Sequence, residues 1–209
     1  MCWLYLGTFG SFIGYSAGLP LLIKSQFPAE NPTQYAFLGP LVGALARPLG
    51  GWVADKLGGA RVTFWNFIVM AGAVFGVLSF LPHGGNGGNF WGFLTLFILL
   101  FFTTGIGNGS TFRMIPVIFL TERQRDAQGK GAEAQEQAVK DANKESAAVL
   151  GFTSAFAAYG AFFIPKSFGT SIAATGGPDA ALYGFVVFYL SCIVMTWWYY
   201  SRKNAEMPC

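Results

Sequence analysis

Arg47 stands out in the segment GPLVGALARPLGGWVADKLGG (residues 39–59), because the residues around it are mostly apolar or small. A guanidinium group is planar, stays protonated and donates several hydrogen bonds from a rigid fork. It can therefore bind the oxygen edge of a carboxylate or of another planar oxyanion through two parallel hydrogen bonds. The chemistry that this residue offers is anion binding.

Patterns typical of catalysis are missing from the sequence. Ser154, Thr104 and Ser110 have no histidine partner, because the single histidine, His83, lies in a loop. The stretch GIGNGS (residues 105–110) superficially resembles a nucleotide-binding loop, but it follows no strand and lies in an apolar run, so we interpret its glycines as packing residues. The cysteines show neither metal nor redox spacing; they are Cys2, Cys192 and Cys209. We expect no enzyme activity, no metal, no cofactor and no nucleic-acid partner.

The elements that position Arg47 are predicted to be membrane helices. Charged residues make up 11% of the 209 residues, whereas a soluble domain carries about 25%. Apolar stretches of about 20 residues, long enough to cross a bilayer, follow one another without the alternation of barrel strands. We therefore predict an all-α integral membrane protein. The six predicted transmembrane helices are residues 1–23, 35–55, 62–81, 90–119, 147–171 and 180–200.

The distribution of Lys and Arg predicts the orientation of these spans. Most of these residues lie in the loops after the second and fourth spans and in the tail. The positive-inside rule then places both termini in the cytoplasm. We expect the protein to be integral to the cell (inner) membrane. We expect a solvated connector at 121–145, or a short surface helix there that leads into the fifth span. The resulting division is residues 1–120 with spans one to four, 121–145 as a cytoplasmic connector, 146–201 with spans five and six, and 202–209 as a cytoplasmic tail.

The charge of Arg47 needs a partner within the membrane. An arginine at the centre of a span costs about 2.5–3.5 kcal/mol even on insertion scales. All ten acidic residues lie in loops, at span ends or in the tail, so we expect an anionic ligand; the alternative is an acid on a segment outside this sequence. Arg113 lies nearer to the end of its span. We expect it to snorkel to the membrane surface, with a second anion contact as the alternative.

Small residues at four-residue spacing predict the contact faces of the helices. Arg47 continues one of these series, so it is expected to project from the same face as its glycines and into the bundle. The four spans that carry these series are predicted to be surrounded by protein, and the bulkier third and sixth spans are predicted to face lipid. The series are Gly10, Gly14 and Gly18; Gly39, Gly43 and Gly51; Gly105 and Gly109; and Ala147, Gly151 and Ala155.

The stretch RPLGGWVADKLGGARV resembles the loop motif G-x-x-x-D-[RK]-x-G-x-[RK] of major facilitator transporters. Gly51 is expected to allow close helix contact, and Asp55 to accept hydrogen bonds from the N-terminus of a neighbouring helix. The resemblance implies a latch for one conformational state rather than a substrate site. The motif positions, within residues 51–61, are Gly51, Asp55, Lys56, Gly58 and Arg61.

Four further stretches are similar to the nitrate/nitrite porters of this superfamily: YLGTFGSFIGYSAG, QYAFLGPLVGALARPLGG, GIGNGSTFRMIPVIF and GFTSAFAAYGAFFIPKSFG. The resemblance implies the C-terminal half of a twelve-helix fold. Its partner is then a missing N-terminal six-helix half, from the same gene or a separate chain, and we expect this chain to be a fragment. The implied substrate-binding residues are Arg47, which grips the anion, the aromatic Tyr5 and Phe9, and Ser154 and Gly151 of the fifth span.

The resemblance implies transport of nitrate and nitrite across the lipid bilayer by alternating access. Buried, unpaired arginines resist reorientation until an anion neutralises them, and this half has no membrane-embedded acid or histidine. We therefore expect nitrate/nitrite exchange. The alternatives are proton-coupled nitrate symport, with a titrating group in the other half, and a non-transporting half-size fragment or accessory subunit.

Overall fold

The computed structural model describes residues 1–82 and 87–202, and within these residues six helical segments are long and apolar enough to cross a membrane. This confirms the prediction of an all-α membrane protein with six spans. His83 and the predicted tail beyond Arg202 lie outside the described residues. The segments are Cys2–Gln26, Pro32–Leu57, Gly59–Phe80, Phe90–Asp126, Ala132–Thr175 and Asp179–Ser201.

The first span is interrupted by a π-helical turn. It consists of α1 (Cys2–Tyr5), η1 (Leu6–Gly10) and α2 (Ser11–Gln26). The buried Thr8 hydroxyl lies 3.2 Å from the carbonyl oxygen of Leu4 and 3.1 Å from the hydroxyl of Thr111. Single π-turns inside α-helices frequently occur at functional sites, and this one carries Phe9.

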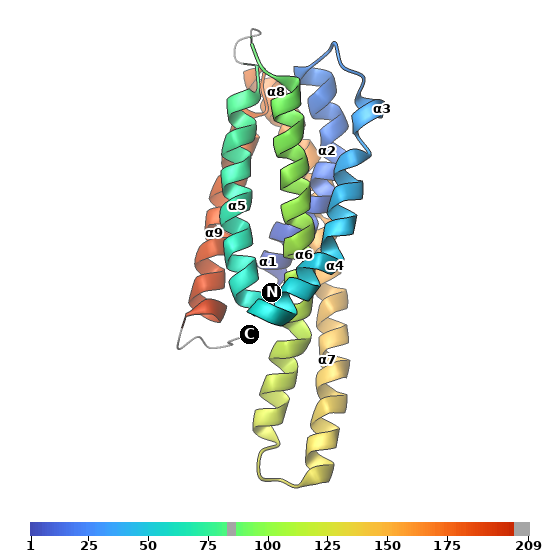
Figure 1. The fold of residues 1–209 in the computed structure, drawn as a ribbon, viewed down its shortest axis with the longest axis vertical. Helices are drawn as coiled ribbons and strands as arrows, with labels where there is room; N and C mark the ends of the chain where they lie inside the picture. Colours follow the sequence, from blue (N-terminus) through green and yellow to red (C-terminus); the bar gives the residue numbers. More distant parts are fainter. Residues whose placement is uncertain (83–86, 203–209) are drawn as a thin grey trace.

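The next three spans lie side by side in Figure 1. The second consists of the short α3 (Pro32–Tyr35) and α4 (Leu38–Leu57), and α5 (Gly59–Phe80) forms the third. Gly58 makes the turn between α4 and α5 with φ 88°, a conformation that costs glycine little. The fourth span, α6 (Phe90–Asp126), runs between α4 and α5 and packs extensively against both.

The fifth span is broken at Tyr159 into α7 (Ala132–Ala158) and α8 (Gly160–Thr175). The sixth span consists of α9 (Asp179–Thr196) and the π-helical η2 (Trp197–Ser201). Gly10, Gly14 and Gly18 of the first span pack on the fifth: a side chain at Gly14, for example, would collide with the carbonyl oxygen of Gly160 and with Ile164.

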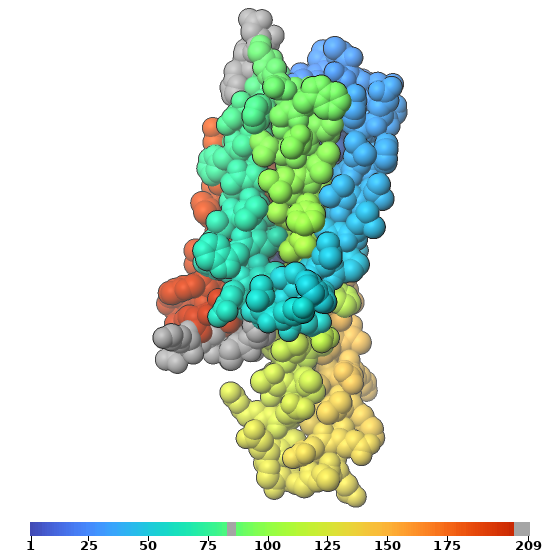
Figure 2. Space-filling view, in the orientation of Figure 1, coloured from blue at the N-terminus to red at the C-terminus, as the bar shows by residue number. Residues whose placement is uncertain are grey.

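The segment 121–145 is largely helical, because α6 continues to Asp126 and α7 begins at Ala132. The structure therefore favours the helical alternative for the predicted connector. Figures 1 and 2 show the two helices standing clear of the bundle as a hairpin. Arg123 and Glu145 join its two arms through an ion pair in which Nε lies 2.9 Å from Oε2.

The backbones of α4 and α6 approach each other closely where both helices carry glycines. Gly105 lies against the backbone of Gly43, and Gly109 lies against the backbone around Arg47. A side chain at Gly50 would collide with the backbone of Ile106. Without hydrophobic drive in lipid, such close backbone approach supplies the dispersion contacts that hold helices together.

The contact face of α4 differs from the four-residue series of the sequence analysis. A helix turns by about 100° per residue, so each four-residue step drifts by about 40°. The buried small residues follow the true helical period, and among the described residues a side chain at Gly51 would meet nothing within 4 Å. Arg47 is half-buried at the edge of the contact face, not at its centre. The buried small residues of α4 are Gly39, Gly43, Ala46, Gly50 and Ala54.

The prediction that the third span faces lipid is wrong for this half. Phe67, Met70 and Val74 of α5 are fully buried, because α5 packs between α6 and α9. The second and fifth spans, predicted to be surrounded by protein, are instead the most exposed in this chain. Large side chains fill the interior of the six-helix unit, whereas the second and fifth spans use one face for packing and leave the other uncovered.

Candidate anion-binding site

Arg47 lies near the middle of α4, and its guanidinium covers an aromatic ring of the first span. The Cζ atom is 5.5 Å from the centroid of the Phe9 ring. A cation over an aromatic face is attracted by the ring quadrupole, by about 0.5–2 kcal/mol depending on desolvation. The π-helical turn η1 carries this ring, so the local irregularity of the first span positions one wall of the site.

Tyr5 extends the site from Phe9 towards the fifth span. The two rings lie 5.4 Å apart between centroids, one helical turn from each other. Tyr5 is 1% exposed, and its hydroxyl interacts with the Ser154 side chain of α7. The structure therefore brings four of the five predicted binding residues together from three spans. The fifth, Gly151, lies one turn before Ser154 on an exposed face of α7.

Arg47 takes part in none of the ion pairs found among residues 1–82 and 87–202. The carboxylates in those pairs bind other cations: Asp55 binds Arg113, Glu145 binds Arg123 and Glu136 binds Lys140. The Arg47 guanidinium is only half-buried and stacks on a neutral ring. The arrangement leaves its hydrogen-bond fork available for an oxyanion.

The loop motif forms a different contact from the one predicted. Asp55, near the end of α4, pairs with Nε of Arg113 on α6 rather than with a helix N-terminus. Arg113 is therefore the ion-pair partner of Asp55 and does not join the Arg47 site. Its snorkelling to the membrane surface stays a prediction. Lys56 lies over the ring of Trp52 at 3.9 Å from the centroid, and Arg61 is exposed. The motif thus links α4 to α6 by charge, at the edge of the glycine contact.

We expect the Asp55–Arg113 pair to matter for transport more than for folding. Both side chains are about half exposed, and such pairs contribute roughly 0–1 kcal/mol to stability. Asp55→Asn and Arg113→Gln should each lower transport about 3- to 10-fold, if the pair favours one state of the cycle by about 1 kcal/mol. The exchanged double variant Asp55→Arg/Arg113→Asp should recover most of the rate. Equal losses in all three variants would contradict a role for the pairing itself.

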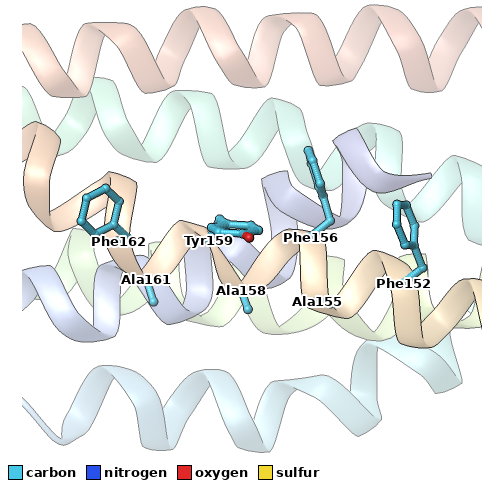
Figure 3. Close-up of a pocket in the computed structure, with 7 residues that line it drawn as sticks. All are labelled: Phe152, Ala155, Phe156, Ala158, Tyr159, Ala161 and Phe162. Atoms are coloured by element: carbon cyan, nitrogen blue, oxygen red, sulfur yellow. The ribbon is translucent and has the colours of Figure 1, made fainter.

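A groove of about 640 Å³ runs along the break between α7 and α8, next to Ser154. In Figure 3, Phe152 and Phe156 project to the same side of the helix. The groove does not include Arg47, and its aromatic rings are widely exposed. It belongs to the uncovered face of the fifth span. The lining residues are Phe152, Ala155, Phe156, Ala158, Tyr159, Ala161 and Phe162.

One polar residue near the site was missed in the sequence. Asn108 of α6 is completely buried, and neither its Oδ1 nor its Nδ2 atom has a hydrogen-bond partner among the described residues. The sequence analysis interpreted GIGNGS only through its glycines. An amide between two glycines in a membrane span was the available signal, because small neighbours leave a polar side chain without cover.

No protein family model matches the chain. The nitrate/nitrite transporter NarU of Salmonella typhimurium is 52% identical over 204 residues, which are 97% of this chain and 44% of that protein. NarU of Escherichia coli is 51% identical over 96% of the chain and 43% of its own length. A probable nitrate/nitrite antiporter, NarK2 of Thermus thermophilus, is 39% identical over 99% of the chain and 42% of its own length. The chain thus spans less than half the length of these relatives, and it aligns with their C-terminal halves.

Proposed function

Since this chain is homologous to the C-terminal half of nitrate/nitrite transporters, we propose that it forms half of a nitrate/nitrite exchanger in which Arg47 binds the anion. The observation that carries the proposal is the Arg47 guanidinium, stacked on Phe9 and paired with no carboxylate among the described residues. A permanent charge at that depth is costly without an anion.

The side chains around Arg47 suit a small planar oxyanion. Nitrate spreads its charge over three oxygens in one plane, and a guanidinium can donate two parallel hydrogen bonds to one edge. The Tyr5 hydroxyl adds a donor, while the Phe9 ring supplies a flat wall that excludes water. Nitrite presents a similar oxygen edge, so the same site accepts either ion.

The uncovered faces of this chain favour a second six-helix half as partner. On α4, Leu41, Leu45 and Leu49 form an exposed apolar row, and Phe152 and Tyr159 expose most of their surface on the fifth span. Arg47 and Ser154 lie on these same two spans. A second bundle that covers them would enclose the anion between the halves, as alternating access requires.

The charges support exchange rather than proton symport. Among the described residues, Asp55 is the acidic residue of α4, the helix that carries Arg47, and it is bound to Arg113. Arginine does not titrate in the physiological range, so this half offers no proton carrier beside the anion. A loaded, neutralised site reorients more easily than an empty, charged one. Each reorientation then carries an anion.

The test uses a chimera in which this chain replaces the matching half of the Escherichia coli relative. In proteoliposomes, we expect nitrate uptake to require nitrite or nitrate inside and to persist when a protonophore collapses the pH gradient. Uptake into anion-free vesicles that depends on a proton gradient would favour symport instead. The chain alone is the control: nitrate flux equal to that of the chimera would contradict the need for a second half.

A further inference from the structure

We propose that Asn108 is a further binding residue for the transported oxyanion, reached through a wedge between η1 and α4. The wedge is the region where η1, which carries Thr8 and Phe9, faces the part of α4 that carries Arg47. The inference rests on the proposed function and deepens it, because it adds a neutral hydrogen-bond donor, the Asn108 amide, to the charged donor Arg47.

The neighbours of Asn108 on α6 define its direction. Thr111 faces η1, since its hydroxyl lies 3.1 Å from that of Thr8. Gly105 and Gly109 face α4, because a side chain at either position would collide with the α4 backbone. With about 100° between successive residues, Asn108 projects between these two directions and therefore into the wedge.

Asn108 also lies at the same depth as Arg47. Its neighbour Gly109 packs against the backbone carbonyl of Arg47, and Gly107 packs against the Thr8 side chain of η1. The Arg47 guanidinium in turn covers the ring of Phe9. Asn108, Phe9 and Arg47 thus occupy one level of the bundle. In the proposed closed state, the anion lies between the Asn108 amide and the guanidinium.

The Asn108 carboxamide lacks the partners that buried amides normally have. It is 0% exposed, and both of its polar atoms are unpaired among the described residues. Asn66, another buried asparagine, donates to the Met70 sulfur at 3.3 Å. An unpaired buried amide costs free energy, and an apolar residue of the same shape would remove that cost. A ligand that accepts hydrogen bonds from the amide during the transport cycle would also remove that cost.

A small oxyanion has the chemistry of that partner. Its oxygens accept hydrogen bonds, and the two N–H groups of an asparagine amide donate them without adding charge. Hydrogen bonds to charged groups are stronger than those between neutral groups. In the proposed closed state, Arg47 neutralises the anion while Asn108 satisfies a further oxygen. The Asn108 amide therefore gains a hydrogen-bond partner only when the anion is bound.

The experiment compares Asn108→Leu with Asn66→Leu in the chimera, measuring the KM for nitrate and the thermal midpoint of the purified protein. For Asn108→Leu we expect KM to rise about 10-fold or more, with an equal or higher thermal midpoint because the unpaired amide is gone. Asn66→Leu should lower the midpoint and leave KM unchanged. Asn108→Ser keeps one hydroxyl donor and should raise KM to an intermediate value, which provides a second test if the leucine variant fails to fold.

An unchanged KM in the folded Asn108 variants would overturn the inference. So would a lower midpoint with a parallel loss of maximal rate, because that result indicates a purely structural amide. These outcomes presuppose that the unmodified chimera transports nitrate. A chimera without nitrate transport would overturn the proposed function, and this inference with it.

Discussion

Arg47→Lys is expected to lower nitrate transport by about 100-fold, although it preserves the positive charge. An ammonium group cannot make the two parallel hydrogen bonds of a guanidinium, and it does not stack on Phe9 in the same way. Losing a charge-assisted bidentate contact of about 3 kcal/mol corresponds to roughly a 100-fold change. Arg47→Gln should be at least as severe, since it also removes the charge that neutralises the anion.

Nitrate uptake into nitrite-loaded vesicles measures the effect of the Arg47 variants. Arg125→Lys is the matched control, because Arg125 is exposed on the hairpin, away from the site. The control should transport at the unmodified rate, and the thermal midpoints of all variants should stay close together. An Arg47→Lys variant with the normal KM and rate would show that the guanidinium geometry does not bind the anion.

Gly105→Val is expected to destabilise the fold by about 3 kcal/mol or more. Its new side chain would collide with the backbone carbonyl of Gly43 and the Cβ atom of Ala46. A backbone carbonyl cannot move aside as a flexible side chain can, so α4 and α6 would have to separate. The separation would also shift Arg47, which lies one turn along α4, and transport should be lost with the fold.

Gly72→Val provides the matched control for Gly105→Val. Gly72 also lies within a membrane span, yet among the described residues a side chain there would meet nothing within 4 Å. We expect the control to keep the unmodified thermal midpoint and a monodisperse size-exclusion profile in detergent. If both variants lowered the midpoint equally, the cause would be the β-branched residue in the helix and not the α4–α6 contact.

The spans were predictable because their signal is local. About 20 apolar residues in a row can only satisfy their backbone in lipid as a helix, and the structure contains the six expected segments. The break at Tyr159 and the π-turn at Leu6–Gly10 were not predicted. At both places the first and fifth spans bring their backbones together, with Gly160 against Gly10, and these two residues are far apart in the sequence.

The glycine series shows how far a spacing rule extends. It correctly placed Gly43 and Gly105 on facing helices, since a single four-residue step drifts by only about 40°. It failed at Gly51, where the accumulated rotation had carried the residue off the contact face. The sequence analysis also predicted that the bulky α5 faces lipid. That prediction failed because hydrophobicity does not distinguish a lipid-facing helix from one in the interior of a membrane protein.

The sequence by itself determined the helical membrane fold, because that fold follows from the cost of exposing backbone to hydrocarbon. The cost of a charge in hydrocarbon likewise predicts an anion at Arg47. Only the tertiary structure decided how these charges are used. It paired Asp55 with Arg113, positioned Phe9 beneath Arg47 and left Asn108 without a partner. Those outcomes depend on how helices far apart in the chain rotate against one another, and no local pattern encodes that rotation.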